Sequence, residues 1–273
     1  MNGADGFESV RRDPDPVRRG RRATDLLTVY QQRAAELARV RRAAIEEAHR
    51  ERGMSYTEIA AALGITKGRI TQIRNTAPRP ERALFGVGPV SIGVPHRYQT
   101  TDRQRPLIAA EDAQTGEVLE RLLGTLAIAV MRYQVEPEQT ALPRGDTIVV
   151  CEPKSAPLAS ELLGRDPAFW MSDESGRRWL NAQDTRIGSP MDDKPARSAD
   201  IAYVARHRET SRIIVHIAGI HAIGSLGAAH FLTGHTAELF HQVGDRSFSL
   251  AIQVSYQGRT ITQTELVAGQ HVW

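Results

Sequence analysis

Residues 55–75, SYTEIAAALGITKGRITQIRN, constrain the fold of this chain more than any other stretch. Ser55 and Glu58 have the spacing of a capping box, in which two side chains satisfy free backbone N–H groups at a helix start. Gly64 suits a tight turn because glycine tolerates a left-handed backbone. Thr66 can cap a second helix. We therefore predict two short helices joined by a turn at Gly64.

The apolar residues of this stretch fit two helices that cross at a steep angle. The first helix is expected over about Tyr56–Leu63 and the second over about Lys67–Asn75. Ala60 is small enough to lie where the helices meet. The corner would be filled by Ile59, Leu63, Ile65, Ile70 and Ile73. This pattern predicts a helix-turn-helix, whose second helix can enter the DNA major groove. A purely protein-binding role is the alternative.

The same segment resembles the last helix-turn-helix of sigma factors and related bacterial regulators. The long sigma-factor segments that engage polymerase are not recognisable. The resemblance implies that base edges are contacted from Thr66, Lys67, Gly68, Thr71, Gln72 and Asn75. Gln72 suits adenine, and Lys67 suits guanine or a phosphate. Arg69 and Arg74 are expected to contact phosphates. Simple solvent exposure remains the alternative for each polar residue.

Charge is distributed unevenly along the chain. Residues 1–82 carry 17 Lys and Arg against 11 Asp and Glu, whereas residues 83–273 carry 18 against 21. A polyanion would therefore meet the N-terminal third.

The fold class predicted from these patterns is α+β with two domains. Residues 1–22 are expected to be a disordered basic tail, either a solvated tail or an arm that touches DNA. Residues 23–77 are the helix-turn-helix domain, with a long supporting helix over about 24–52. Residues 78–83, which contain Pro78 and Pro80, form a linker. Residues 84–273 form an α/β domain for ligand sensing and dimerisation.

The C-terminal domain alternates apolar strands and helices, which indicates a Rossmann-like, mostly parallel sheet. The clearest expected elements are strands over 147–151 and 213–218, helices over 102–132 and 222–243, and a hairpin over 248–266. Residues 172–197 are polar and are expected to form a long loop or a small insertion.

Two turns at the carboxyl ends of expected strands suggest a ligand site. One contains Lys154 and Ser155, and the other is rich in glycine and opens a helix, where free N–H groups favour phosphate. The expected ligand residues are Lys154, Ser155, Asp200, Arg206, Gly219, His221, Gly224, Ser225 and Gly227. The alternatives are close helix–sheet packing at Gly224 and Gly227, or a catalytic site. Neither turn matches a Walker loop or the dinucleotide fingerprint.

The chain also resembles, more loosely, actinobacterial regulators that join a sigma-like helix-turn-helix to a Rossmann-like domain. The resemblance is carried by the helix-turn-helix and by CEPKS at 151–155, RSADIAYVARHR at 197–208 and HIAGIHAIGSLGAAH at 216–230. It implies a sensor domain without naming the ligand.

Other chemistry has weak support in the sequence. Cys151 is the only cysteine, and it ends an apolar strand, so we expect a buried, inert thiol. The histidines between 216 and 241 lack a converging metal-ligand spacing. No metal site, no certain cofactor and no catalytic residue are therefore assigned. The absence of a long apolar run or a secretory signal predicts a cytoplasmic protein with no membrane partner.

These observations predict a nucleoid-associated transcriptional regulator that binds double-stranded DNA, senses a small, nucleotide-like effector and acts as a homodimer. Two alternatives stay open. One is a DNA-tethered enzyme that processes nucleotides or NAD. The other is a nucleoid or defence-associated adaptor that binds DNA without sequence preference.

Overall fold

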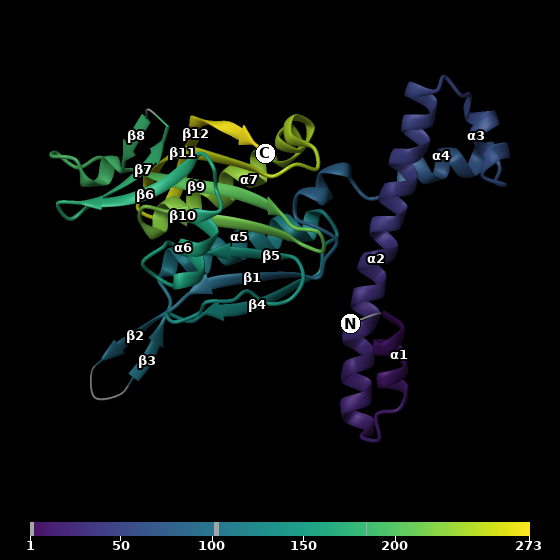
Figure 1. The fold of residues 1–273 in the computed structure, drawn as a ribbon, viewed down its shortest axis with the longest axis horizontal. Coiled ribbons are helices and arrows are strands. Elements are labelled where there is room, and N and C mark those ends of the chain that lie inside the picture. Colours follow the sequence, from purple (N-terminus) through teal and green to yellow (C-terminus); the bar gives the residue numbers. More distant parts are fainter. Residues whose placement is uncertain (1–2, 101–103, 184) are drawn as a thin grey trace.

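The computed structural model describes residues 3–100, 104–183 and 185–273 of the chain. It has an α+β architecture, with helices in the N-terminal part and a large sheet covered by helices in the C-terminal part (Figure 1). The N-terminal helices are α1 (Gly3–Arg11), α2 (Pro16–Glu51), α3 (Tyr56–Ala62) and α4 (Lys67–Thr76). The long helix α2 stands beside the sheet, and α3 and α4 lie at its C-terminal end.

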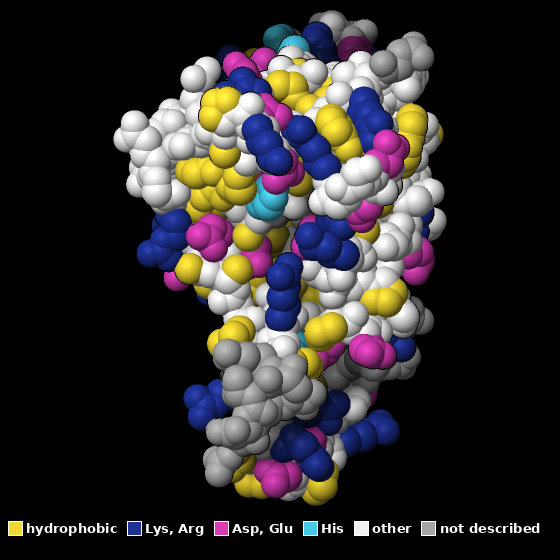
Figure 2. All heavy atoms as spheres, turned by 90° about the vertical axis from the view of Figure 1, so that its left-hand side faces the viewer, with side chains coloured by type: hydrophobic (Ala, Val, Ile, Leu, Met, Phe, Trp, Pro, Cys, Tyr) yellow, Lys and Arg dark blue, Asp and Glu magenta, His cyan; other side chains and the backbone are white. Residues whose placement is uncertain are grey.

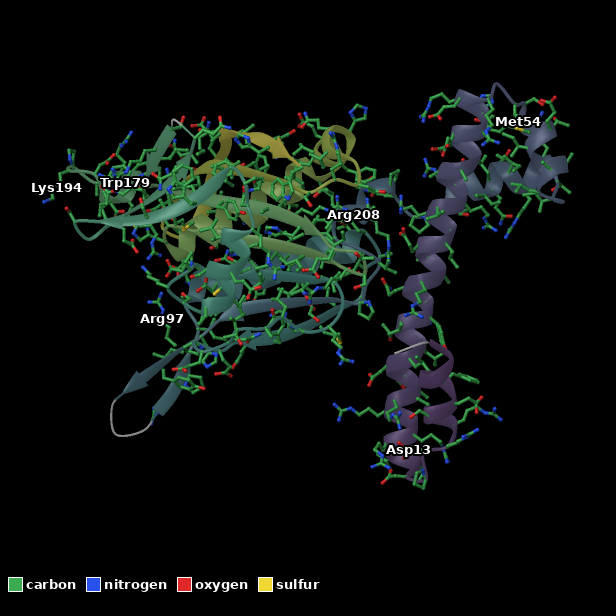
Figure 3. All side chains as sticks on the ribbon, in the orientation of Figure 1. Asp13, Met54, Arg97, Trp179, Lys194 and Arg208 are labelled. Atoms are coloured by element: carbon green, nitrogen blue, oxygen red, sulfur yellow. The ribbon has the colours of Figure 1, made fainter. Side chains whose placement is uncertain are left out.

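The structure differs from the expectation of a disordered tail over residues 1–22, because this segment contains α1 and the start of α2. Asp15 caps α2 by accepting a hydrogen bond from the N–H of Arg18 at 2.8 Å, and Pro16 takes the first helical position. Asp13, in the turn between the helices (Figure 3), is 4% exposed and pairs with Arg18 and Arg22. These arginines hold the pKa of Asp13 well below its usual range. Arg18 and Arg22 therefore hold α1 and α2 together as a helical hairpin. Residues 1–2 lie outside the described residues.

The segment expected to be a linker, 78–83, is tied to its surroundings. It contains the 3₁₀ helix η1 (Pro80–Leu84), in which Arg82 is fully buried. The Arg82 guanidinium donates to three backbone carbonyls of the C-terminal part and to the side chain of Gln32 on α2, at 2.6–3.0 Å. This contact fastens α2 to the rest of the chain.

The large sheet contains seven strands in the order β12–β11–β9–β10–β5–β1–β4. Their bounds are β1 (Val90–Pro95), β4 (Val130–Val135), β5 (Thr147–Val150), β9 (Ala199–Arg208), β10 (Ile213–Gly219), β11 (Phe248–Gln257) and β12 (Thr260–Val272). The neighbours β4, β1, β5 and β10 are parallel, and β9 and β12 run the opposite way. The prediction of a mostly parallel sheet is therefore confirmed.

Both faces of the central strands are buried. Ile148 and Val150 of β5 pack with α5 (Ala110–Thr125) and α7 (Ala222–Val243), whereas Val149 of β5 and Cys151, which follows the strand, pack with α6 (Pro157–Gly164). Burial on two sides explains why the β5 sequence is continuously apolar rather than alternating.

Two expected segments differ from the structure. The helix expected over 102–132 is limited to α5, with β2 (Arg97–Thr100) and β3 (Gln104–Leu107) before it and β4 after it. A left-handed residue, Ala127 with φ +55°, separates α5 from β4. Residues 102–103 lie outside the described part of the chain.

The loop or insertion expected over 172–197 contains most of a second sheet, formed by β6 (Phe169–Glu174), β7 (Arg177–Ala182) and β8 (Thr185–Gly188), followed by the 3₁₀ helix η2 (Pro190–Asp192). Ser175 and Gly176 both have positive φ, which is the geometry of a tight hairpin turn. The short strands and the polar outer residues hid this hairpin in the sequence pattern.

We predict that Gly227→Ala destabilises the fold. A Cβ at Gly227 in α7 would lie 2.1 Å from Cγ1 of Val254 on β11, so the helix would have to move off the sheet. We expect chemical denaturation to show a loss of about 1–3 kcal/mol in the free energy of unfolding. Gly234 in the same helix has open space around it, and Gly234→Ala should stabilise by about 0.5–1 kcal/mol. Equal effects at the two positions would contradict this packing account.

Candidate functional site

The corner between α3 and α4 is fixed by caps at both helix starts. The N–H of Ser55 donates to the Glu58 carboxylate at 2.8 Å, and the N–H of Glu58 donates to the Ser55 hydroxyl at 3.3 Å. Gly64 has a φ of +66°, the left-handed backbone that favours glycine. The Thr66 hydroxyl accepts from the N–H of Arg69 at 3.2 Å. Two independent caps thus hold the direction in which α4 leaves the turn.

The inner faces of these helices pack on the C-terminal end of α2. The shared core, in which each residue is at most 3% exposed, consists of Ile45, Ile59, Ala60, Ile70 and Ile73. Leu63 was expected in this core but is 50% exposed, because it follows the last residue of α3 and faces outward.

The outer face of α4 is polar. Its exposed residues, together with the cap, are Thr66, Lys67, Gly68, Arg69, Thr71, Gln72, Asn75 and Thr76. Arg74 is only partly exposed, and its guanidinium lies over the Tyr56 ring at 4.5 Å. Arg69 donates to the Gln72 side-chain oxygen at 2.6 Å. The Gln72 side-chain oxygen keeps a second lone pair and the amide NH₂ remains a donor, so bidentate pairing with adenine is compatible with this contact.

The second candidate site is a small pocket at the carboxyl ends of β1, β5 and β10. In open α/β sheets, this edge is where ligands bind, at the point where connections leave in opposite directions. The pocket holds about 30 Å³, and among the predicted ligand residues it is lined by Ser155, Gly219, His221 and Ser225. This volume is close to that of one water molecule. Figure 2 shows this side of the molecule, where basic and acidic side chains are interspersed without a large area of one sign.

Several ion pairs meet at Glu152, which lines this pocket. Its carboxylate contacts Arg178, lies 3.2 Å from the guanidinium of Arg97 and lies 3.4 Å from Lys154 Nζ. The Ser155 hydroxyl also donates to it, at 3.3 Å. The charge of Lys154, which the sequence suggested for a ligand phosphate, is therefore shared with Glu152. Arg97 lies at the base of the β2–β3 hairpin, on this side of the domain (Figure 3).

The start of α7 is anchored by Asp200 on β9. The fully buried Asp200 carboxylate accepts from the N–H of His221 at 3.0 Å and from the N–H of Gly224 at 2.9 Å. The N–H of Gly219 donates to the Ser225 hydroxyl at 3.0 Å. These N–H groups were expected to be offered to a ligand phosphate. Asp200 therefore acts as a built-in anion for this helix rather than as a ligand contact.

His221 lies between two carboxylates. Its Nδ1 is 3.1 Å from Asp200, and its Nε2 is 3.3 Å from Asp192. The hydrogen bond to Asp200 is the main cause that raises the pKa of His221. In its protonated form, this imidazole ties the start of α7 to both β9 and η2.

The three glycines of the expected site serve close packing. A Cβ on Gly219 would lie 2.1 Å from the carbonyl oxygen of His221, and a Cβ on Gly224 would lie 2.5 Å from the Asp200 carboxylate. Gly227 faces β11 and does not line the pocket. The packing alternative therefore accounts for Gly224 and Gly227.

Arg206 was expected near the carboxyl-end pocket, and the structure corrects this. It lies near the other end of the sheet, 1% exposed, and donates to the backbone carbonyls of Ala83, Gly244 and Arg246 at 2.8–3.1 Å. Burial lowers the pKa of Arg206 to about 10. Side chains alternate between the two faces of β9, and Arg206 lies on the face that packs against the core. Its carbonyl partners belong to segments that are distant in the sequence.

Sequence reasoning missed Asp112, which lines the carboxyl-end pocket from the first turn of α5. Asp112 is 9% exposed, and no hydrogen bond to its carboxylate occurs among the described residues. Burial raises the pKa of Asp112 to about 7. The available signal was an acidic residue in a helical first turn, but the helix was expected to begin earlier, which placed Asp112 in its interior.

Two other titratable groups near this pocket belong to the core. Burial raises the pKa of the Cys151 thiol to about 12, so it stays protonated at neutral pH. His216 is fully buried beside it and contacts the Cys151 carbonyl oxygen through Nε2 at 2.8 Å; burial lowers its pKa to about 4. Within the described ranges, no group of three or more His, Cys, Asp or Glu side chains is placed to hold a metal ion.

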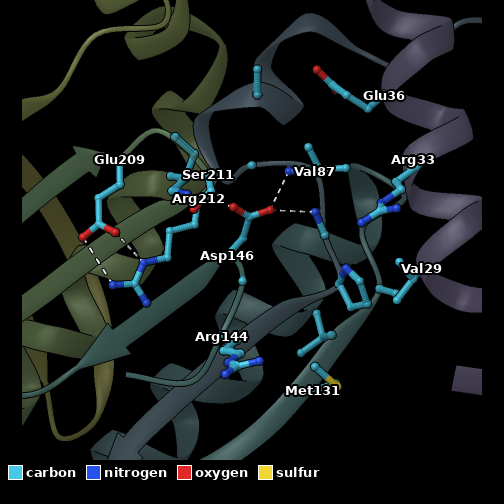
Figure 4. Close-up of a pocket in the computed structure, with 18 of the residues that line it drawn as sticks. Val29, Arg33, Glu36, Val87, Met131, Arg144, Asp146, Glu209, Ser211 and Arg212 are labelled. Carbon is cyan, nitrogen blue, oxygen red and sulfur yellow. Dashed lines mark hydrogen bonds and ion pairs between the residues drawn. The ribbon is translucent and has the colours of Figure 1, made fainter. Parts of the chain in front are cut away.

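A larger cleft of about 950 Å³ lies at the opposite end of the sheet, between α2 and the loops that precede β1, β5 and β10 (Figure 4). Asp146 organises its floor by accepting from the N–H groups of Val87, Gly88 and Ile213 at 2.7–2.9 Å. Six arginines and five acidic residues line the cleft. Its mixed charge does not select one sign of ligand, so we assign it no ligand.

Comparisons with family models, with curated proteins and with solved structures find no significant match to this chain. No helix of the described residues has the length and apolar character to cross a membrane.

We predict that the Asp112 carboxyl makes stability depend on pH. Because its folded pKa is raised, the native state holds a proton that the unfolded chain has released, and stability falls as pH rises from about 4 to about 7. Asp112→Asn removes this effect. The variant should gain about 3–4 kcal/mol in unfolding free energy relative to the parent chain between pH 4 and pH 8. A difference that stays constant with pH in denaturation experiments would contradict this account.

Proposed function

We propose that this chain is a sequence-specific DNA-binding regulator in which α3 and α4 act as a helix-turn-helix. The observation that carries the proposal is the two-sided character of α4. Its inner face is fixed by Ile70 and Ile73, whereas seven neighbouring polar or glycine positions, Thr66 to Asn75, are open to a partner. Rigid presentation of a polar helix face is what base recognition in the major groove requires.

The polar residues of α4 suit two kinds of DNA contact, those to base edges and those to phosphates. Lys67, Thr71 and Gln72 lie exposed along the N-terminal half of α4 and suit base edges. Arg69 suits a phosphate, and its hydrogen bond orients Gln72 before DNA arrives. Arg74 stacks on Tyr56 and is therefore better suited to holding α4 in place than to reaching a distant phosphate. The net positive charge of residues 1–82 supports approach to a polyanion.

For the C-terminal domain, we propose a sensor role at the carboxyl-end pocket, with a Rossmann-like arrangement around β1. The order β4–β1–β5–β10 puts this pocket where doubly wound sheets bind nucleotides. The Asp112 carboxyl suits a hydroxyl donor such as a sugar. Arg97, which lines the pocket, and Lys154, which pairs with Glu152 beside it, suit a phosphate. Because the pocket has room for only one small group, a nucleotide-like effector would have to part the ion pairs of Glu152.

The proposed regulator would act as a homodimer and would not turn its effector over. Opening at Glu152 would move Arg178 on β7 and Arg97 at the start of β2, so effector binding would favour one arrangement of the domain over another. The buried contact between Arg82 and Gln32 of α2 can pass a change of angle to α3 and α4.

The DNA contact predicts a sequence-dependent loss for Gln72→Ala. On a duplex selected for tight binding by the full chain, we expect the dissociation constant to rise by the equivalent of about 1–3 kcal/mol, with a relaxed preference at one base pair. Gln263→Ala, at an exposed position on β12, is the matched control and should bind as the parent does. Fluorescence anisotropy measures both; unchanged affinity and preference in Gln72→Ala would contradict the base contact.

The sensor role predicts that the full chain, purified from cells, retains a phosphate-containing small molecule in native mass spectrometry. Asp112→Ala combined with Lys154→Ala should lose that added mass, whereas Gly234→Ala, distant from the pocket, should keep it. Retention by the double variant would contradict the assignment of the site. Recovery of a chemically converted molecule after incubation would favour the enzyme over the sensor.

A further inference from the structure

Two cationic groups lie close together beside the carboxyl-end pocket, and each is paired with a carboxylate of the chain itself. His221 Nε2 lies 3.3 Å from the Asp192 carboxylate, and Lys154 Nζ lies 3.4 Å from the Glu152 carboxylate. The hydrogen bond to Asp200 is the main cause that raises the pKa of His221, while the nearby charge of Lys154 lowers it. Both ion pairs are longer than a strong charge-assisted hydrogen bond of about 2.7–2.9 Å. Each is therefore a weak pair that another anion can replace.

The His221 ring is oriented by Asp200 rather than by Asp192. The buried Asp200 carboxylate accepts from the His221 N–H at 3.0 Å and lies 3.1 Å from Nδ1. A partner at one ring nitrogen fixes the imidazole and leaves the other nitrogen to a second partner. The His221 side chain is 35% exposed and lines the pocket. Nε2 is therefore a fixed donor on a ring that is open to solvent.

Asp192 joins η2 to the start of α7. On its other side, this segment is held by β7, because Arg177 donates to the Ser189 carbonyl at 3.0 Å and to the Asp193 carboxylate at 2.7 Å. Asp192 is the last residue of η2, and its side chain is 28% exposed. The ion pair between Asp192 and His221 thus connects the small sheet to the helix that opens at the pocket.

We propose that Asp192 occupies the place of the effector's phosphate at His221, and that a phosphate group at the pocket takes the Nε2–H donor from Asp192 and frees η2 from α7. A phosphate carries more negative charge than a carboxylate and has more oxygens to accept with, so it can contact His221 and Lys154 together. Asp192 and Glu152 each serve only one of these two cations. The inference rests on the proposed function, because it assigns the phosphate of the proposed effector to these side chains.

The contact is tested first without a ligand, by NMR titration of the His221 imidazole in the full chain. Asp192→Ala should lower the pKa of His221, because the charge of Asp192 adds to the effect of Asp200. Asp192→Glu keeps the carboxylate and should restore the parent value. The control is Asp245→Ala, which removes a carboxylate paired with Arg208 at the opposite end of the sheet and should change nothing. A pKa of His221 that is equal in Asp192→Ala and in the parent would overturn the proposal.

The exchange of partners is tested with methyl phosphate as the probe, followed at the same imidazole resonance. At about pH 6.5, a phosphate monoester is mostly doubly charged. Asp192→Ala should bind the probe about two- to fivefold more tightly than the parent, because it removes the competing member of an exposed ion pair. Asp192→Glu and Asp245→Ala should bind as the parent does. Equal affinities of Asp192→Ala and the parent, or no binding by either, would also overturn the proposal.

Release of η2 is read from amide hydrogen exchange in the parent chain. The N–H of Met191 donates to the Ser189 hydroxyl, and the N–H of Asp193 donates to the Pro190 carbonyl, both at 3.2 Å. Methyl phosphate should speed exchange at these two amides, and unchanged exchange would refute the release. None of these measurements involves DNA or a molecule retained from cells. A chain that passes them but binds no DNA would refute the proposed regulator and leave the phosphate contact at His221 standing.

Discussion

The buried guanidinium of Arg82 is the constraint on which the two-part architecture depends. It is fully buried, and in the described part of the chain its hydrogen bonds go to three backbone carbonyls and to Gln32 of α2 rather than to a carboxylate. Burial lowers the pKa of Arg82. A buried charge is tolerated only while its hydrogen-bonding partners stay in place. The buried hydrogen bonds of Arg82 therefore help to join the helical part to the sheet, beside an open cleft.

The charged groups around the candidate pocket are likewise paired with one another inside the protein. Asp200 already satisfies the start of α7, and Glu152 already gathers Arg97, Lys154 and Arg178. The Asp112 carboxyl in the pocket lining makes no hydrogen bond among the described residues, and burial raises its pKa to about 7. A ligand would have to compete with these internal pairs. That competition gives a physical route from occupancy to rearrangement, since the same side chains connect β2, β5 and β7.

The sequence predicted what local pattern controls and missed what distant partners control. The caps at Ser55 and Thr66, the turn at Gly64 and the apolar strand β5 have signals within a few residues, and the structure contains them. Asp200 was placed in the wrong role because its partners at the start of α7 lie more than twenty residues away.

The same limit explains the other differences. The sequence suggests that Arg206 is a free cation, yet its guanidinium donates hydrogen bonds to the backbone carbonyls of Ala83 and Gly244, which lie in distant segments. Asp13 reads as part of a solvated tail, although Arg18 and Arg22 bury its charge. In each case, a polar side chain is matched by tertiary contacts that no local pattern records.

The most direct measurement is selection of random-sequence DNA duplexes by the intact chain, followed by sequencing of the retained pool at low and at physiological salt. The account predicts enrichment of a motif with two related half-sites about one helical turn apart, and its loss when the outer face of α4 is altered. Retention without enrichment would contradict sequence-specific recognition, and no retention at low salt would refute a DNA-binding role for α3 and α4.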